Sequence, residues 1–246
     1  MKAAPEAQKR LLDLAELDSI ADRLAHRRRT LPELAEIDEQ TKQFARFATE
    51  AIEAETEASD LAREQGKAES DVDTVRTRAD RDQKRLDSGA VTSPKDLASL
   101  QSEIVSLQRR QGDLEEVVLE IMERREAADT KVRDLVARRD EIAASRSAAE
   151  ERRDTALAEL DKEAADVAGR RTGVAADLPA DLGALYDKLR QQYGVAAAKL
   201  YRGQCQGCKV SLSIAEMNRL KAAPHDEVLR CEECRRILVR TPESGL

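Results

Sequence analysis

Apolar residues recur in a seven-residue rhythm along much of the chain. The first run extends from Phe44 to Leu86 and alternates steps of three and four residues over six heptads. Such a rhythm predicts a helix that winds around another helix, because one side of each turn has to be buried. The positions that face this seam are Phe44, Ala51, Ala58, Gln65, Val72, Ala79 and Leu86, together with Phe47, Ala54, Leu61, Ala68, Val75 and Asp82.

A second run of the same kind begins at Leu97 and continues to Val167. Its seam positions include Leu97, Ile104, Gln111 and Val118, together with Leu100, Leu107, Leu114, Ile121, Ala128, Leu135, Ile142 and Ala149. Its seam is apolar at first and weakens toward the far end, where Arg139, Arg146 and Arg153 occupy seam positions. Arginines can lie there because their methylene stems cover apolar surface while the guanidinium reaches water. The two runs together predict a long antiparallel coiled-coil hairpin.

The segment DSGAVTSPKDL between the runs predicts the tip of the hairpin, near residues 87–95. Gly89 can adopt a left-handed conformation and end the first helix. Ser93 can cap the second helix, with Pro94 at its first position. A turn this short makes the two helices antiparallel neighbours.

The N-terminal part carries an apolar seam of different phase, which includes Leu14, Leu17 and Leu24. Pro32 lies where the phase changes, so we expect a break near residues 30–33. In a hairpin with its tip near residue 91, the first 25 residues would pair with the far end of the second arm.

The second arm is expected to end where glycine and proline become frequent. Gly169, Gly173 and Pro179 indicate a linker, followed by a short helix at about 180–192. The predicted domains are a coiled-coil hairpin at 1–170, a linker with a short helix at 171–194, and a small β domain at 195–246.

Composition agrees with a mainly α fold of elongated helices. Of the 246 residues, 37% are charged and only 2% are aromatic, which argues against one compact core. Disorder is the competing interpretation of such a composition, and the sustained heptads exclude it. The net charge of −7 gives no general attraction to nucleic acid, although the segment after residue 195 carries nine basic and six acidic residues.

All four cysteines stand in two Cys-x-x-Cys pairs, Cys205/Cys208 and Cys231/Cys234, with 22 residues between the pairs. Two thiolates of one tight turn can bind the same Zn²⁺, and a second turn completes the tetrahedron. The segment between the pairs predicts a small helix (SIAEMNRLKAA) and a strand (DEVLRC). With VAAAKLYRG and RRILVR as further strands, we expect a zinc ribbon that holds one structural Zn²⁺ through all four cysteines.

A redox role for the cysteine pairs is the main alternative, but a thioredoxin-like site needs a βαβ fold that this segment is too short to form. Catalytic zinc usually has a histidine or carboxylate ligand and an open position. His26 and His225, the only histidines, are expected on a helix surface and in a solvated loop. Without a phosphate-binding loop or nucleophile motif, we expect no enzyme and no small-molecule substrate.

Basic residues gather around the cysteine pairs and beside one aromatic ring. Such residues can engage phosphates and stack a base, in DNA or RNA. A solvated charged surface, balanced by Glu232 and Glu233, is an equally simple interpretation. The candidate nucleic-acid contacts are Tyr201, Arg202, Lys209, Arg235, Arg236 and Arg240.

The chain resembles a bacterial family of coiled-coil proteins with a C-terminal C4-type zinc ribbon, and its actinobacterial branch in particular. The resemblance rests on CQGCKVSLSIAEMNRL, on DEVLRCEECRRILVRTPESGL and on the tip SPKDLASLQSEIVSL. It implies zinc ligation by the four cysteines and binding rather than catalysis: nucleic-acid contact, flagellar or secretion-linked chaperoning, or transcription-factor partnering. Arg235 departs from the glycine that relatives usually place after the fourth cysteine, where the turn can require a positive φ.

Two hypotheses about function follow. In the first, the ribbon binds nucleic acid or a nucleic-acid-associated protein, and the hairpin holds a second partner. In the second, the chain is a purely protein-binding scaffold or chaperone that acts through the hairpin. An exposed apolar seam could drive dimerisation as easily as partner binding, so the sequence leaves the oligomeric state open. A role like that of transcription factors whose acidic hairpin tip enters RNA polymerase is disfavoured, because Asp87 and Asp96 form no close acidic pair. The chain contains no run of 18 apolar residues, so we expect no membrane partner. The cytosol is the expected location.

Overall fold

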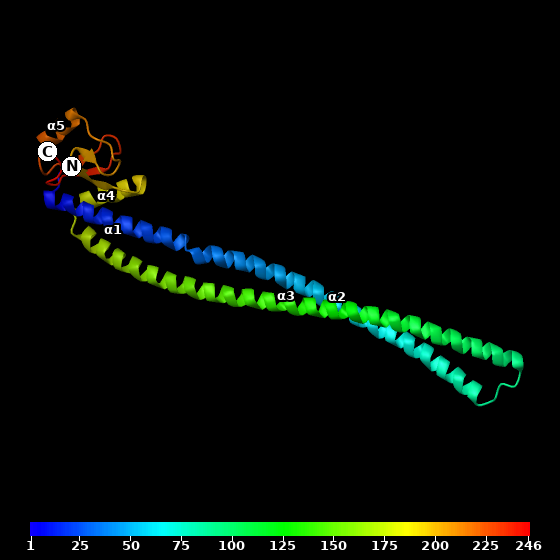
Figure 1. Ribbon diagram of the computed structural model, residues 1–246. Helices are drawn as coiled ribbons and strands as arrows, with labels where there is room; N and C mark the ends of the chain where they lie inside the picture. Colours follow the sequence, from blue (N-terminus) through cyan, green and yellow to red (C-terminus); the bar gives the residue numbers. More distant parts are fainter. The chain divides into compact units, whose positions relative to one another are not determined.

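The computed structural model describes residues 1–246 and contains five helices and four short strands (Figure 1). The helices are α1 (Pro5–Arg29), α2 (Pro32–Asp87), α3 (Pro94–Ala176), α4 (Ala180–Tyr193) and α5 (Ile214–Ala222). The strands are β1 (Ala197–Tyr201), β2 (Gln204–Cys205), β3 (Leu229–Arg230) and β4 (Ile237–Val239). None of the helices combines the length and the apolar composition that a membrane span requires.

The chain divides into two compact units whose boundaries differ from the predicted domains. Unit 2 comprises residues 35–150, and unit 1 comprises residues 1–34 together with 151–246. The N-terminal helix and the end of α3 therefore belong to the same unit as the zinc ribbon. The reason is that α1 packs against the ribbon strands as well as against α3, as described below.

Unit 2 is an antiparallel pair formed by most of α2 and α3. Residues that lie progressively earlier in α2 pair with residues progressively later in α3: Gln65 accepts a hydrogen bond from Arg125, and Gln40 donates one to Ser145. The predicted seam is confirmed, because the residues of this unit that are buried all occupy its positions. They are Ala51, Ala54, Leu61, Ala79, Asp82, Leu100, Ile104, Ile121, Ala128, Leu135 and Ala149.

At the tip the two helices end and begin where the sequence predicts, although the Ser93 hydroxyl makes no capping hydrogen bond to α3. The first helix ends at Asp87, and Gly89 follows with a left-handed φ of 66°. The second helix begins at Pro94, and the N–H of Leu97 donates to the carbonyl of Ser93 at 3.0 Å. In Figure 1 the cyan end of α2 and the green start of α3 are joined by this loop.

The break between α1 and α2 falls at residues 30 and 31, as the change of phase and Pro32 predict. Within unit 1, α1 pairs with the last part of α3 and with the connection that follows it: Arg28 contacts Asp161 of α3, and Arg10 contacts Asp177 directly after its end. The apolar contacts between the two helices come from Leu17, Leu24, Leu160 and Val167.

The predicted start of the linker is wrong by several residues. Helix α3 continues through Gly169 and Gly173 to Ala176, and only residues 177–179 connect it to α4. A Cβ at either glycine would meet open space and neither has a positive φ, so no close approach or special backbone form explains them. A surface glycine costs a helix about 1 kcal/mol relative to alanine, which the packing of this end against α1 offsets. The short helix after Pro179 is confirmed.

The four strands of unit 1 form one sheet in the order β2-β1-β4-β3. Strands β1 and β4 are parallel, with Ala198 opposite Leu238, whereas the two outer pairs are antiparallel. Beyond β3 the N-terminal segment continues the edge, since the N–H of Ala3 donates to Asp226 and the N–H of Val228 donates to Met1.

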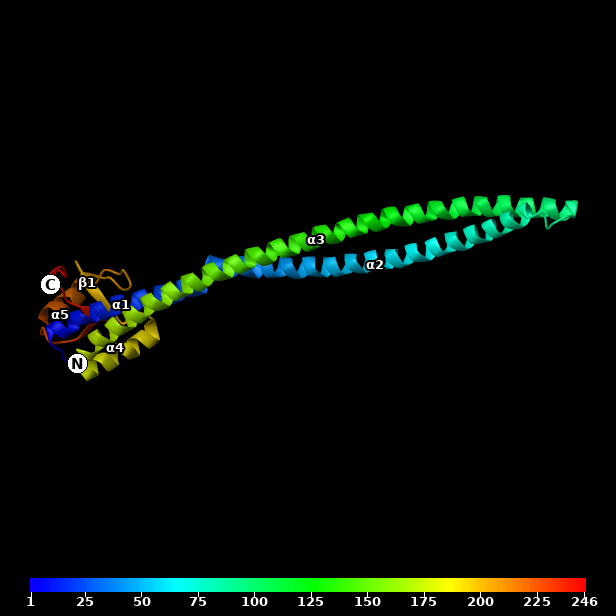
Figure 2. The same cartoon turned by 90° about the horizontal axis from the view of Figure 1, so that it is seen from below.

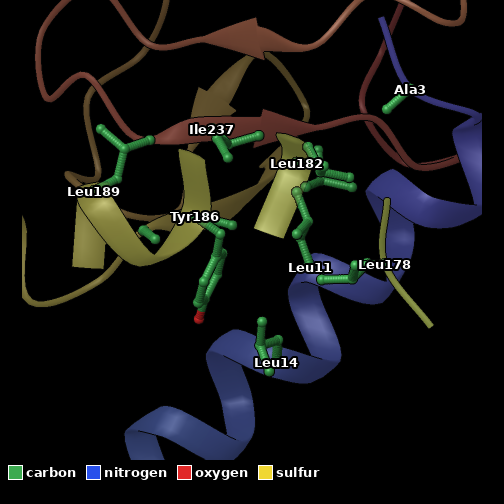
Figure 3. Close-up of a cluster of buried hydrophobic side chains, with 11 residues drawn as sticks. Ala3, Leu11, Leu14, Leu178, Leu182, Tyr186, Leu189 and Ile237 are labelled. Atoms are coloured by element: carbon green, nitrogen blue, oxygen red, sulfur yellow. The ribbon is translucent and has the colours of Figure 1, made fainter. Parts of the chain in front are cut away.

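The main core of unit 1 lies between this sheet, α1 and α4, and Figures 2 and 3 show the three together. Leu11 and Leu14 of α1 meet Leu182 of α4 and Ile237 of β4, all of them at most 1% exposed. The core therefore joins segments from both ends of the chain. A ribbon of about 50 residues could not bury this much apolar surface alone.

One buried carboxylate organises the polar edge of the same core. Asp18 is 2% exposed and accepts hydrogen bonds from the hydroxyl of Tyr186 and from Nε of Arg171, each at 2.7 Å. Nε of Arg190 lies 3.2 Å from its second oxygen. Two guanidinium groups and a hydroxyl thus compensate the buried charge, as a buried ion needs, and they tie α1, α3 and α4 together.

Candidate metal centre

The first cysteine pair lies in a tight turn at the end of β2. The N–H of Lys209 donates to the carbonyl of Cys205 at 2.8 Å, and the N–H of Cys205 donates to the carbonyl of Val210 at 3.0 Å. These two bonds fold the backbone so that Cys205 and Cys208 face the same side. Cys205 is fully buried and Cys208 is half-buried.

The second pair repeats this turn between β3 and β4. The N–H of Arg235 donates to the carbonyl of Cys231, and the N–H of Cys231 donates to the carbonyl of Arg236, both at 3.0 Å. Arg235 has a φ of 61°, the same value as Lys209 at the equivalent position of the first turn. The expected strain at Arg235 is therefore present, because left-handed φ disfavours residues with a Cβ.

The two turns bring all four sulfur atoms within 4.8 Å of one another. Sγ of Cys205 lies 3.8 Å from Sγ of Cys234, and Sγ of Cys208 lies 3.9 Å from Sγ of Cys231. A tetrahedral Zn²⁺ at about 2.3 Å from each sulfur requires separations of about 3.8 Å. The donor set and its spacing therefore fit one structural Zn²⁺ with a closed coordination shell.

The two fully buried thiols, Cys205 and Cys231, resist ionisation on their own. Burial raises the pKa of Cys231 to about 12 and also raises the pKa of Cys205. Burial acts in the same direction on Cys234, but a hydrogen bond from the main chain of Arg236 and bonds from the other thiols outweigh it and lower the pKa of Cys234. A divalent cation supplies the charge that lets buried thiols become thiolates.

The apolar shell of the site is built from the sheet and α5. Leu200, Leu220 and Leu238 are at most 1% exposed and pack around the cysteines. Helix α5 begins after Ser213, whose hydroxyl accepts a hydrogen bond from the N–H of Glu216 at 3.1 Å. This shell covers Cys205 and Cys231, which are fully buried, whereas Cys208 and Cys234 are half-buried.

Arg236 is a support of the first cysteine turn. Its Nε donates to the carbonyl of Val195 at 3.0 Å. A Cβ placed on Gly207, inside the first turn, would lie 2.9 Å from Cδ of Arg236 and 3.0 Å from Cβ of Ala198. A glycine at position 207 therefore leaves the space that the side chain of Arg236 occupies against the first cysteine turn.

The guanidinium of Arg240 is hydrogen-bonded to main-chain carbonyls. Its guanidinium donates to the carbonyls of residues 223, 224, 225 and 227 at 2.6 to 3.1 Å. It thereby satisfies the carbonyls that follow α5. His225 takes part here through its main chain, and its side chain is exposed, as is that of His26.

The remaining predicted contacts lie in different surroundings. The ring of Tyr201 has Lys199 and Arg202 over it, at 5.5 and 5.3 Å from the centroid. Lys209 donates to the side chain of Gln206 at 2.7 Å. Arg235 is exposed beside the second cysteine turn.

A groove beside the second turn contains two arginines that the sequence analysis missed. Arg219 of α5 and Arg230 of β3 line it together with Arg235. Nε of Arg230 donates to the carbonyl of Arg235 at 2.8 Å, which holds these two residues together. The position of Arg230 directly before Cys231 was the available signal, because the turn after it brings the chain back toward Arg235.

The fold and the site define a coiled-coil hairpin protein with a C-terminal C4-type zinc ribbon. Residues 14–194 match the CT398-like coiled coil hairpin domain, and residues 204–238 match the C4-type zinc ribbon domain. The chain belongs to the CT398-like coiled-coil hairpin family, as the resemblance in the sequence implies.

Relatives share both parts over nearly their whole length. The uncharacterized protein Rv2229c of Mycobacterium tuberculosis is 37% identical over 240 residues, which cover 98% of each chain. A solved structure from Mycobacterium smegmatis has a TM-score of 0.85 at 36% identity and covers 98% of this chain and 100% of its own. CT398 from Chlamydia trachomatis has a TM-score of 0.69 at 18% identity, covering 96% and 98%, and shows the shared fold alone.

Proposed function

We propose that the chain is a non-enzymatic adaptor whose ribbon binds nucleic acid or a nucleic-acid-associated protein. The observation that carries the proposal is the groove of about 520 Å³ beside the second cysteine turn, with Arg219, Arg230 and Arg235 in its lining. Arginine suits this role because its planar guanidinium can bind a phosphate through two hydrogen bonds.

Two of the three arginines are available to a ligand. Arg219 forms an ion pair with Glu232 at 2.6 Å, whereas Arg230 and Arg235 have no carboxylate partner. The zinc turn places Arg235 by its backbone, so the metal orders the surface that would meet a phosphate. Arg240 is excluded from this role because its guanidinium is bonded to main-chain carbonyls.

The test is ultraviolet crosslinking of the tagged full chain in its own cells, followed by end-labelling of co-purified nucleic acid. An Arg230→Ala/Arg235→Ala variant removes the available charges of the groove. Arg109→Ala/Arg110→Ala on α3 is the matched control, because it removes the same charge from exposed positions of unit 2. A zinc assay on each protein shows that the ribbon is intact.

Label on the wild type and the control that falls at least about fivefold in the groove variant would support nucleic-acid binding. Nuclease digestion then separates DNA from RNA. A protein crosslink that needs the same arginines, without label, would identify a nucleic-acid-associated protein as the partner. Equal label on the wild type, the groove variant and the control variant would show that the groove does not bind nucleic acid.

A second function, a scaffold that binds protein through the hairpin, is favoured by exposed apolar side chains on α3. Leu119 and Met122 are 59% and 45% exposed. The seam arginines are a weaker argument for a missing partner, because the guanidinium groups of Arg139 and Arg153 pair with the aspartates that follow them. The apolar stretch earlier in α3 is the surface that a protein partner would use.

A further inference from the structure

The seam of unit 2 is incompletely buried over one stretch. No residue of α2 between Leu61 and Ala79 is buried, and none of α3 between Ile104 and Ile121. The seam residues there, such as Val72, are only half-buried. Pairing of α2 with α3 thus leaves apolar surface uncovered in the stretch that Figure 2 shows in cyan and green.

Polar links between the helices lie at the two ends of this stretch. Arg78 of α2 contacts Glu103 of α3 at the end toward the tip. Arg125 donates to Gln65 at 3.1 Å at the other end. Between these two polar links no hydrogen bond or ion pair connects α2 to α3. The two helices are therefore held together there by apolar contacts alone.

A groove of about 360 Å³ lies within the stretch. On α2 its lining follows helical spacing from Glu69 to Arg76, and on α3 it includes Val118 and Leu119. Met122, three residues after Leu119, extends the same face of α3 and is also exposed. Leu119 and Met122 therefore extend the apolar lining of the groove onto the solvent-exposed surface of α3.

The rim of the groove is acidic. On α3 the groove is lined by Glu115, which belongs to a segment, residues 113–123, with five acidic residues and no basic one. On α2, the groove is lined by Glu69 and Asp73, and the only cation in its lining, Arg76, is paired with Asp73 at 2.7 Å. An apolar floor between acidic walls selects a partner that is apolar along one stripe and positively charged on both sides.

The geometry points to a docking site for an amphipathic helix of another protein, with an apolar stripe flanked by lysine and arginine. Such a helix completes the burial of Val72, Val118 and Leu119 as the third helix of a local bundle. This inference rests on the scaffold function and names its partner class. A second copy of the chain is disfavoured as the occupant, because it would place two acidic rims against each other.

The experiment uses the zinc-loaded full chain and a fluorescent probe peptide. The probe is a helix of about 18 residues made of leucine and lysine, with leucine at alternating steps of three and four. A peptide with glutamate in place of lysine is its control. Binding is followed by fluorescence anisotropy at physiological ionic strength, and sedimentation reports the oligomeric state of each protein.

Two variants of matched exposure separate the groove from the general surface. Leu119→Ser/Met122→Ser removes apolar side chains from the groove and from the face of α3 that extends it, and Leu34→Ser/Ile52→Ser removes exposed ones of α2 outside the stretch. We expect the groove variant to bind the lysine peptide about tenfold more weakly, the control variant to bind as the wild type does, and the glutamate peptide to bind to none.

Equal weakening in both variants, or no binding by the wild type, would overturn the proposal. So would self-association of the wild type that the groove variant abolishes, since a second copy would then be the occupant. The ribbon function stays separate, because the groove variant retains Arg230 and Arg235 and its nucleic-acid crosslinking is measured independently. A protein that crosslinks elsewhere on the hairpin would leave the scaffold function standing without this site.

Discussion

At the residue scale, the turns that bind the metal hold two long side chains in an unfavourable backbone region. Lys209 and Arg235 both have a φ of 61° directly after a cysteine pair. The carbonyl bonds of each turn keep them there. The positive φ is unfavourable at both residues, but it lets the two cysteines of each turn direct their sulfur atoms to one point.

Replacing Arg235 with glycine should relieve part of this cost. We expect Arg235→Gly to raise the free energy of unfolding of the zinc-loaded unit 1 by about 1 kcal/mol. Chemical denaturation monitored at the ribbon checks the value. Glu233→Gly, in the same turn but without a positive φ, should lower stability instead, and a gain of equal size in both variants would contradict the explanation.

The hydroxyl of Tyr186 should make unit 1 sensitive to alkaline pH. Burial, and then the hydrogen bond to Asp18, raise the pKa of Tyr186 above its ordinary value of 10.0. The unfolded chain loses this proton near pH 10 while the folded chain keeps it. Stability is therefore complete below about pH 10 and falls above it, toward the folded pKa, by up to about 1.4 kcal/mol per pH unit.

Tyr186→Phe removes both the proton and its hydrogen bond. We expect a loss of about 1 kcal/mol at neutral pH and a flatter decline above pH 10, measured as the urea midpoint at several pH values. Tyr201→Phe on the ribbon surface is the control. A decline as steep in Tyr186→Phe as in the wild type would assign the alkaline sensitivity to other groups.

At the element scale, the ribbon strands are too short to stand without the metal. Strands β2 and β3 have two residues each, and β4 has three. Their pairing depends on the two cysteine turns, which Zn²⁺ locks together. Helices α2 and α3, in contrast, have 56 and 83 residues and take no part in metal binding.

Removal of the zinc should therefore loosen one part of the chain selectively. After chelation we expect hydrogen exchange to increase in β1 and β4, while amides of α2 and α3 in unit 2 keep their protection. Far-ultraviolet circular dichroism should lose little helical signal. Loss of most of that signal would show that the hairpin helices depend on the metal.

The helices could be predicted from the sequence because their burial repeats regularly. Leu61, Leu100 and Ile121 are buried at seam positions that the heptads assign. The end of α3 could not be placed, because Gly169 and Gly173 are helix breakers only where packing does not oppose them. The cysteine site was predictable from spacing, since two short turns leave little choice of geometry.

The contacts of polar side chains could not be predicted in the same way. Asp18 sits in an ordinary helical sequence, and its partners Arg171 and Arg190 come from helices more than 150 positions later. Arg240 is one of several arginines near the cysteines, and only the folded loop after α5 sets it apart. Such contacts depend on how distant segments meet, which no local pattern encodes.

At the scale of the whole molecule, unit 1 is assembled from two stretches that flank unit 2 in the sequence. The core around Leu11 connects α1 to β4 and α4. The metal site thus depends on a helix that lies near the other end of the chain, through the sheet that both of them contact.

A core substitution in α1 should consequently weaken zinc retention. Leu11→Ala, at a fully buried position, should destabilise unit 1 by about 2–5 kcal/mol and speed the transfer of zinc to a chelating dye. Leu135→Ala makes the same deletion in the core of unit 2 and should leave that rate unchanged. Equal rates for both variants would show that the ribbon holds its metal independently of α1.

The pairing of the first residues with the ribbon edge also sets an order of events during synthesis. Gln8 donates a hydrogen bond to the carbonyl of His225, 217 positions away. At about 5–20 residues per second, roughly 10 to 45 seconds separate the appearance of the two residues. The hairpin of unit 2 can close within that time, whereas the apolar face of α1 waits for the ribbon. A nascent chain therefore exposes Leu11 and Leu14 until the ribbon has been synthesised, and unit 1 completes its folding after unit 2.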